Sequence, residues 1–106
     1  MDKTTIMLVC SAGLSTNLLM AKMQTAAIHQ NIAADIFAVP ASEADEKLEE
    51  KPVDVLLLGP QVRFLKAEYE KRLTPKGILL DVINMGDYGL MNGEKVLAHA
   101  LSLLDK

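Results

Sequence analysis

The sequence predicts an α/β domain with a four-stranded parallel sheet and helices on both faces. Short apolar runs alternate with helical patterns four times along 106 residues, which is the pattern of consecutive βα units. The run at 53–58 is apolar almost throughout, as expected of a parallel strand that is buried on both faces. Right-handed crossovers in such a chain favour the doubly wound strand order 2-1-3-4.

Each predicted element has its own local signal in the sequence. Apolar runs that end at turn residues predict strands at 6–9, 33–39, 53–58 and 78–83. Helical spacing and capping residues predict helices at about 16–30, 42–50, 60–73 and 90–104, and 84–89 is predicted to be a loop.

Some side chains within the predicted helices have an expected environment. The apolar positions that we expect to face the core are Leu19, Met23, Ala26 and Ala27 in the first helix and Leu90, Leu97, Ala100, Leu101 and Leu104 in the last. Ser42 is expected to cap the second helix. Glu68 and Arg72 are spaced as an exposed ion pair. His29 and His99 fall at unrelated helical positions, and we interpret them as surface or hydrogen-bonded residues.

Composition argues against several classes of function. The chain has 14 acidic against 11 basic residues and only four aromatic ones, which argues against nucleic-acid binding. Its single cysteine rules out an internal disulfide and a multi-cysteine metal site, and we expect neither a metal nor a cofactor. No apolar run approaches the roughly 18 to 20 residues that span a bilayer, and no secretory signal precedes the first strand. We therefore expect one cytoplasmic, monomeric domain over residues 1–106.

The single cysteine, Cys10, ends the first apolar run and is the candidate reactive group. It is followed by small, hydroxyl and cap-forming residues: Ser11, Ala12, Gly13, Leu14, Ser15, Thr16 and Asn17. Unpaired amides of a loop and a helix N-terminus stabilise an anion, so they would favour the nucleophilic thiolate. The same amides, with the hydroxyls of Ser11, Ser15 and Thr16, could hold the oxygens of a phosphoryl group on the sulfur. A lone cysteine often only fills space, but ligands bind at the carboxyl ends of parallel strands.

The sequence of this loop differs from those of other anion-binding loops, and the differences argue against nucleotide binding and rapid phosphate hydrolysis. It contains neither G-x-x-x-x-G-K-[ST] nor G-x-G-x-x-G, so it is not a nucleotide cradle of those kinds. Its nearest chemical relative is the C-x5-R-[ST] loop of low-molecular-weight tyrosine phosphatases, but Thr16 occupies the arginine position. Without that bidentate guanidinium, attack of water on a thiophosphate should be slow. A site that accepts phosphate without readily hydrolysing it behaves as a carrier.

Two segments carry a resemblance to a known family: Cys10-Ser11-Ala12-Gly13-Leu14-Ser15-Thr16 after the first strand and Leu57-Leu58-Gly59-Pro60-Gln61 after the third. They resemble the IIB component of the lactose, cellobiose and diacetylchitobiose branch of the bacterial sugar phosphotransferase system. The resemblance covers essentially the whole chain and implies a phosphocysteine–sugar phosphotransferase component. It implies that Cys10 takes a phosphoryl group from a histidine of the IIA component. Cys10 would then deliver it to a disaccharide, such as cellobiose or another β-glucoside or chitobiose, bound by the membrane IIC component.

In the strand order 2-1-3-4 the switch point lies between the first and third strands, where a crevice for ligands is expected with the Cys10 loop on one side. We consider other residues as contacts from its opposite side. Gly59, Pro60 and Gln61 follow the third strand, and Tyr88 follows the fourth, so all four belong to the same edge of the sheet as Cys10. Gln61 could donate to phosphate oxygens or simply start the third helix, and Tyr88 could reach the site or be a half-buried surface residue. Two alternative functions stay open: a cysteine-dependent phosphatase or arsenate-reductase-like enzyme, and a non-catalytic module that binds an anion or a partner.

Overall fold

A computed structural model describes residues 3–11 and 14–104 of the chain. The strands are β1 (Thr4–Cys10), β2 (Ala34–Pro40), β3 (Val55–Leu58) and β4 (Leu79–Val82). The α-helices are α1 (Leu14–His29), α2 (Ala41–Glu50), α3 (Lys66–Leu73), α4 (Met85–Gly89) and α5 (Gly93–Leu104). Two 3-10 segments, η1 (Pro60–Leu65) and η2 (Thr74–Lys76), flank α3.

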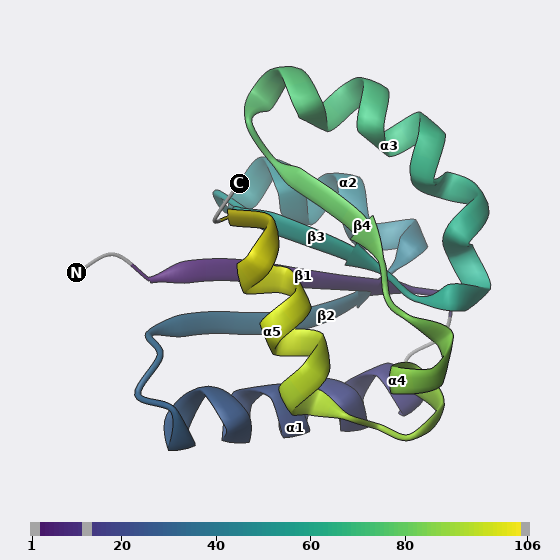
Figure 1. Ribbon diagram of the computed structural model, residues 1–106. Coiled ribbons are helices and arrows are strands. Elements are labelled where there is room, and N and C mark those ends of the chain that lie inside the picture. Colours follow the sequence, from purple (N-terminus) through teal and green to yellow (C-terminus); the bar gives the residue numbers. More distant parts are fainter. Residues whose placement is uncertain (1–2, 12–13, 105–106) are drawn as a thin grey trace.

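The four strands form one parallel sheet in the order β2-β1-β3-β4, which confirms the predicted topology (Figure 1). The register places Cys10 opposite Pro40 of β2, and Val9 opposite Leu58 of β3. Because the strands are parallel and in register, the loops that follow them meet at one edge. The end of β1 with Cys10 and the turn with Gly59 both lie at this carboxyl edge of the sheet.

Helices cover both faces of the sheet, as the sequence predicts. In Figure 1, α1 and α5 lie on one face and α2 and α3 on the other. The first face packs residues of β1 and β3 against Leu19, Met23 and Leu97, and the second packs the alternate strand residues against Tyr69 and Leu73. The inward positions predicted for the first helix, Leu19, Met23, Ala26 and Ala27, are all buried. Burial of both faces explains why β1 and β3 read as continuous apolar runs.

The segment after β4 differs from the prediction of a loop at 84–89. It forms the short helix α4, whose N-terminus is capped by Asn84, because the Asn84 Oδ1 accepts a 3.0 Å hydrogen bond from the Asp87 N–H. The last helix begins at Gly93 rather than Leu90, after a turn in which Met91 has a φ of +53°. Leu90 is therefore 78% exposed instead of facing the core, whereas Leu97 and Ala100 are buried as predicted. Of the two last leucines of the stripe, Leu101 is half-buried and Leu104 is exposed.

Two helix starts also differ from the sequence interpretation. Helix α2 begins at Ala41 directly after β2, with Pro40 in the cap position, so Ser42 lies inside the helix and is not its cap. The predicted helix at 60–73 is divided, because the chain leaves helical geometry at Val62 before α3 begins. The predicted pair of Glu68 and Arg72 is confirmed, with 3.5 Å between Arg72 Nη1 and Glu68 Oε2.

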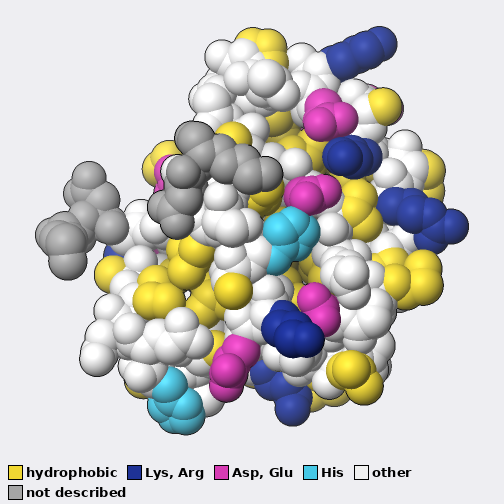
Figure 2. Space-filling view, viewed as in Figure 1, with side chains coloured by type: hydrophobic (Ala, Val, Ile, Leu, Met, Phe, Trp, Pro, Cys, Tyr) yellow, Lys and Arg dark blue, Asp and Glu magenta, His cyan; other side chains and the backbone are white. Residues whose placement is uncertain are grey.

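Charged side chains are mixed over the face shown in Figure 2. Acidic and basic groups alternate there, and the described residues on this face gather no continuous basic patch.

Candidate functional site

Cys10 lies at the carboxyl end of β1, one of the two central strands of the sheet. Its side chain is only 2% exposed, and the Sγ–H donates to the Val39 carbonyl oxygen at 3.8 Å. The strands on both sides of β1 limit the directions from which a reactant can reach the sulfur. Access is therefore from the loop side, beyond the end of the strand.

A small cavity opens beside the sulfur. Its volume is about 120 Å³, and it is lined by Cys10, Asn17, Ala38, Val39 and Pro40. A cavity needs roughly 10–15 Å³ to admit one water molecule, so this one has room for a group of several heavy atoms such as a phosphoryl group. The structure thus brings Asn17, a predicted loop residue, next to the cysteine together with the end of β2.

The predicted phosphate loop begins in the chain between the cysteine and α1. Ser11 follows Cys10 and is exposed, whereas Ala12 and Gly13 lie outside the described residues. Helix α1 begins at Leu14, and the side chains of Leu14 and Ser15 also lie outside the described part. The first turn of a helix has unpaired N–H groups and partial positive charge, which stabilise a nearby anion.

Thr16 has a different environment from the one expected of a phosphate-binding hydroxyl. Its side chain is fully buried, and its Oγ1 lies 3.1 Å from the hydroxyl of Tyr88. Tyr88 reaches this position from α4, which Figure 1 shows next to the N-terminal end of α1. The structure therefore brings Tyr88 to the helix that follows the cysteine, and Tyr88 is a buried residue rather than a half-buried surface one.

The turn after β3 lies on the other side of Cys10. The Gly59 N–H donates to the Val9 carbonyl oxygen at 2.8 Å, which continues the pairing of the two strands to their ends. A β-carbon built on Gly59 would be 3.8 Å from the Cys10 β-carbon and 3.1 Å from Gln61 Oε1. The end of the exposed Gln61 side chain thus lies close to Gly59, whereas Pro60 is buried at the start of η1.

Sequence reasoning did not single out the end of β2, although it lines the cavity. Ala38, Val39 and Pro40 come from the strand next to β1, and Pro40 is the register partner of Cys10. The predicted strand order could have indicated these residues, because the order 2-1-3-4 places the end of the second strand beside that of the first. The sequence interpretation placed the crevice only on the side of the third strand.

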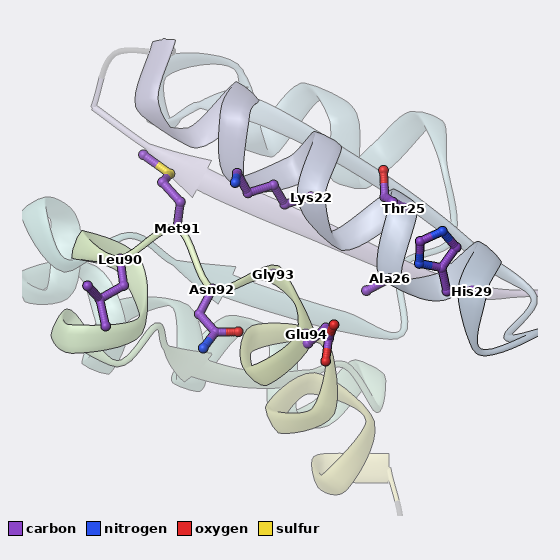
Figure 3. A pocket seen from close by; sticks show the side chains of 9 residues that line it. All are labelled: Lys22, Thr25, Ala26, His29, Leu90, Met91, Asn92, Gly93 and Glu94. Carbon is purple, nitrogen blue, oxygen red and sulfur yellow. The ribbon is translucent and has the colours of Figure 1, made fainter.

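A larger hollow of about 440 Å³ lies elsewhere, between α1 and the turn that joins α4 to α5. Figure 3 shows Lys22, Thr25 and His29 on the α1 side, with Leu90 and Asn92 on the turn. None of the predicted site residues lines it, whereas Cys10 and Asn17 both line the smaller cavity. In the described residues, no three His, Cys, Asp or Glu side chains gather in a way that could hold a metal ion.

Comparison with known proteins identifies the family. Residues 5–99 match the family model for the lactose/cellobiose-specific IIB subunit of the phosphotransferase system. The chain belongs to this family. IIB subunits are phosphotransferase components that work with IIA and IIC components to relay a phosphoryl group to a sugar.

Individual IIB proteins align with this one over nearly their full length. The galactose-specific EIIB component of Lactococcus lactis subsp. cremoris is 48% identical over 104 residues, which is 94% of this chain and 95% of that protein. The cellobiose-specific EIIB component of Lactococcus lactis subsp. lactis has the same identity and coverage. The solution structure of the cellobiose-specific IIB component from Borrelia burgdorferi is 41% identical. It superposes with a TM-score of 0.77 over 98% of this chain and 94% of that one.

The family match and the solved structure of the Borrelia burgdorferi relative confirm the predicted fold class. They also confirm the predicted resemblance to IIB components. Among the described residues of this IIB subunit, no helix is both long and apolar enough to cross a bilayer.

Proposed function

We propose that Cys10 is the residue of this IIB subunit that carries the phosphoryl group. The observation that supports this role is the position of the only thiol in the sequence, at the carboxyl end of a central strand and beside a cavity that the first turn of α1 helps to line. Among the other described residues that line it, Asn17 and the end of β2 offer no second nucleophile. The phosphoryl donor is a phosphohistidine of the IIA component, and the acceptor is a sugar held by the IIC component.

The first transfer loads the sulfur. The Cys10 thiolate attacks the phosphorus of the phosphohistidine, an S–P bond forms, and the N–P bond breaks. The imidazole leaves with the electron pair of that bond and takes up a proton. The amides of the loop and of the first turn of α1 hold the phosphoryl oxygens, because preorganised donors stabilise the charge that such a transfer spreads over them.

The second transfer unloads the sulfur. A sugar hydroxyl attacks the phosphorus, an O–P bond forms, and the S–P bond breaks to restore the thiolate, while the hydroxyl proton passes to a base. Water is a competing attacker, and phosphatases of similar fold use an arginine to stabilise that reaction. In this chain the corresponding position is Thr16, whose hydroxyl is buried against Tyr88. The phosphocysteine should therefore last long enough to meet its acceptor.

The sugar is proposed to be a β-linked disaccharide of the cellobiose type. One relative that is 48% identical is named for galactose and another of the same identity for cellobiose, so identity alone does not separate these two sugars. The solved relative from Borrelia burgdorferi is named for cellobiose. Selectivity for the sugar would belong mainly to the IIC component, which binds it, and the IIB subunit would work at the cytoplasmic surface of the membrane while docked to IIC.

Intact-mass measurement tests the role of Cys10. The protein is incubated with phosphoenolpyruvate, enzyme I, the histidine carrier protein and a matched IIA component, and then compared with Cys10→Ser and Cys10→Ala. We expect one added phosphate on the wild type, located at Cys10 by peptide mapping, and none on either variant. Phosphate on the wild type and on both variants would overturn the assignment.

The same samples separate the alternatives. Thiol-dependent turnover of p-nitrophenyl phosphate that Cys10→Ser abolishes would indicate a phosphatase instead of a carrier. A wild-type protein that gains no phosphate while the matched IIA is phosphorylated would indicate a binding module. For a carrier we expect stoichiometric labelling by IIA and negligible turnover of the free phosphate ester.

A further inference from the structure

Tyr88 and Thr16 form a buried contact that the transfer chemistry above does not use. Their hydroxyl oxygens lie 3.1 Å apart, and either one can be the donor. The two residues are 72 positions apart in the sequence, so the bond joins α4 directly to the first turn of α1. Both side chains are buried, which protects this hydrogen bond from competition by water.

The Tyr88 side of the contact is held firmly. The Tyr88 N–H donates to the Asn84 carbonyl at 2.9 Å, and the Tyr88 carbonyl accepts from the Met91 N–H at 3.1 Å. Its ring belongs to the same apolar core as Leu19 and Leu97, on the face covered by α1 and α5. The phenol oxygen is therefore a fixed point to which a neighbouring element can be tied.

The Thr16 side of the contact belongs to the element that must be placed accurately. Thr16 is the third residue of α1, and the next residue, Asn17, lines the cavity beside Cys10. The N–H groups of this first turn have no partner within the helix. A buried hydroxyl without a partner is costly, so the helix end is most stable where Thr16 meets Tyr88. This hydrogen bond can fix the position of the first turn relative to the sulfur. Side-chain packing alone would define that position less precisely.

We propose that Tyr88 is a positioning residue for phosphoryl transfer at Cys10. It acts through Thr16, holding the N-terminal turn of α1 where its amides face the sulfur and the phosphoryl group that the sulfur receives. This inference rests on the proposed role of Cys10 and adds to it a residue from the opposite end of the chain. Tyr88 is not among the described residues that line the cavity beside Cys10, so it would act only through Thr16.

The test compares two tyrosine-to-phenylalanine variants. Tyr88→Phe keeps the ring but removes the hydroxyl that meets Thr16. Tyr69→Phe is the matched control, because Tyr69 is also buried but lies in α3 on the other face of the sheet. We expect Tyr88→Phe to slow single-turnover transfer from IIA to Cys10 by about three- to tenfold, the range that loss of one buried hydrogen bond gives. Tyr69→Phe should transfer at the wild-type rate.

Alkylation of Cys10 by iodoacetamide gives a readout that does not depend on the IIA component. Weaker alignment of the amides should shift the pH profile of alkylation towards higher pH in Tyr88→Phe, and leave it unchanged in Tyr69→Phe. Denaturant unfolding of each variant shows whether the fold survives. In the double variant Tyr88→Phe/Thr16→Val, no hydroxyl is left without a partner, so stability should recover while the slow transfer persists.

Three outcomes decide the matter. If Tyr88→Phe transfers and alkylates like the wild type, the inference is wrong although the role of Cys10 stands. If the double variant regains the rate together with stability, Tyr88 has a structural role only and the inference is again wrong. If the wild type itself takes no phosphate from IIA, the proposed function fails, and the alkylation profiles alone then show whether Tyr88 positions the loop.

Discussion

Asp81 Oδ2 lies 2.8 Å from His99 Nε2, so a carboxylate on the edge strand β4 is tied to the middle of α5. The other oxygen of Asp81 accepts from the Val82 N–H at 2.8 Å and lies 3.8 Å from Lys66 Nζ of α3. One half-buried carboxylate thus links a strand to a helix on each face of the sheet. It also confirms the interpretation of His99 as a hydrogen-bonded helix residue.

These contacts predict an acid-dependent contribution to stability. Burial raises the pKa of Asp81, but the hydrogen bonds from Val82 and His99 and the charges of His99 and Lys66 outweigh it, so the pKa lies below its usual value. A lowered pKa in the folded state means that the carboxylate stabilises the fold above its unfolded pKa of about 3.9 and loses this effect as the pH falls through the folded value. Asp81→Asn should therefore be less stable than the wild type at pH 6, and this difference should shrink below about pH 4.

Urea unfolding at pH 6, 4.5 and 3 measures that difference. Because Asp81 is partly exposed, we expect no more than about 1 kcal/mol at pH 6. Glu94→Gln is the control, since Glu94 is exposed and makes no ion pair with the described residues. A gap between wild type and Asp81→Asn that stays constant from pH 6 to pH 3 would contradict the prediction.

Gly93 sits where α5 passes close to α1. A β-carbon built on Gly93 would lie 2.5 Å from the Lys22 carbonyl carbon and 2.7 Å from the Met23 nitrogen, and these backbone atoms can move only with the helix. Gly93→Ala should therefore lower the free energy of unfolding by about 1–3 kcal/mol, the usual cost of overpacking.

Gly89 at the end of α4 provides the matched control for that substitution. A β-carbon there would meet nothing within 4 Å, so Gly89→Ala should leave stability unchanged or raise it by up to about 1 kcal/mol. Chemical denaturation of both variants makes the comparison. Equal effects of the two substitutions would show that the contact between α1 and α5 is not as close as the structure has it.

Gly59→Ala tests whether the side-chain amide of Gln61 donates a hydrogen bond to the phosphoryl group. The backbone of Gly59, at φ −63° and ψ 152°, suits alanine, and the nearest obstacle to its methyl group is the mobile end of Gln61. The free energy of unfolding should change by less than about 1 kcal/mol, while the new methyl group pushes the Gln61 side chain away. If Gln61 donates to the phosphoryl group, Gly59→Ala and Gln61→Ala should slow loading of Cys10 by a similar factor of about three to ten. Wild-type rates in both variants would exclude that role.

The order of strands and helices could be predicted because burial on both faces leaves a strong signal in this sequence. The runs that became β1 and β3 contain almost only apolar residues, and the α1 stripe of Leu19, Met23, Ala26 and Ala27 fits a helix with one buried side. Helix α4 was missed because five residues are too few to show helical spacing. Its one local signal is the capping residue Asn84, whose side-chain oxygen accepts a hydrogen bond from the Asp87 N–H.

The start of α5 shows how a correct pattern can be extended too far. Leu90 has the spacing of the inward stripe, but Asn92 is the better start signal, and its Oδ1 accepts from the Lys95 N–H at 3.2 Å. In the site, the position of Cys10 follows from strand order alone. The bond between Thr16 and Tyr88 does not, because no local rule relates two side chains that are 72 residues apart and meet only through tertiary packing.

Two exposed apolar side chains lie in the segments that follow β3 and β4 at the carboxyl edge. We predict that the phosphoryl donor docks over them. Phe64 in η1 is 75% exposed, and Met85 at the start of α4 is 64% exposed. If Cys10 carries the phosphoryl group, as we propose, a IIA component has to cover this edge to reach the sulfur, and exposed apolar residues of this size are typical of such contacts. Phe64→Ser and Met85→Ser should therefore raise the KM for phosphorylated IIA.

Ile28 near the end of α1 allows that effect to be separated from a general loss of surface hydrophobicity. It is 73% exposed, but it lies at the opposite end of α1 from the cysteine loop. The minority of interface side chains that contribute strongly cost about 1–2 kcal/mol or more when truncated. If Phe64 is one of them, we expect a roughly five- to thirtyfold rise in KM for Phe64→Ser and no change for Ile28→Ser. All of these side chains are exposed, so unfolding free energies should stay within about 0.5 kcal/mol of the wild type. A rise in KM of equal size for Ile28→Ser would contradict the prediction, because Ile28 lies at the end of α1 that is remote from Cys10.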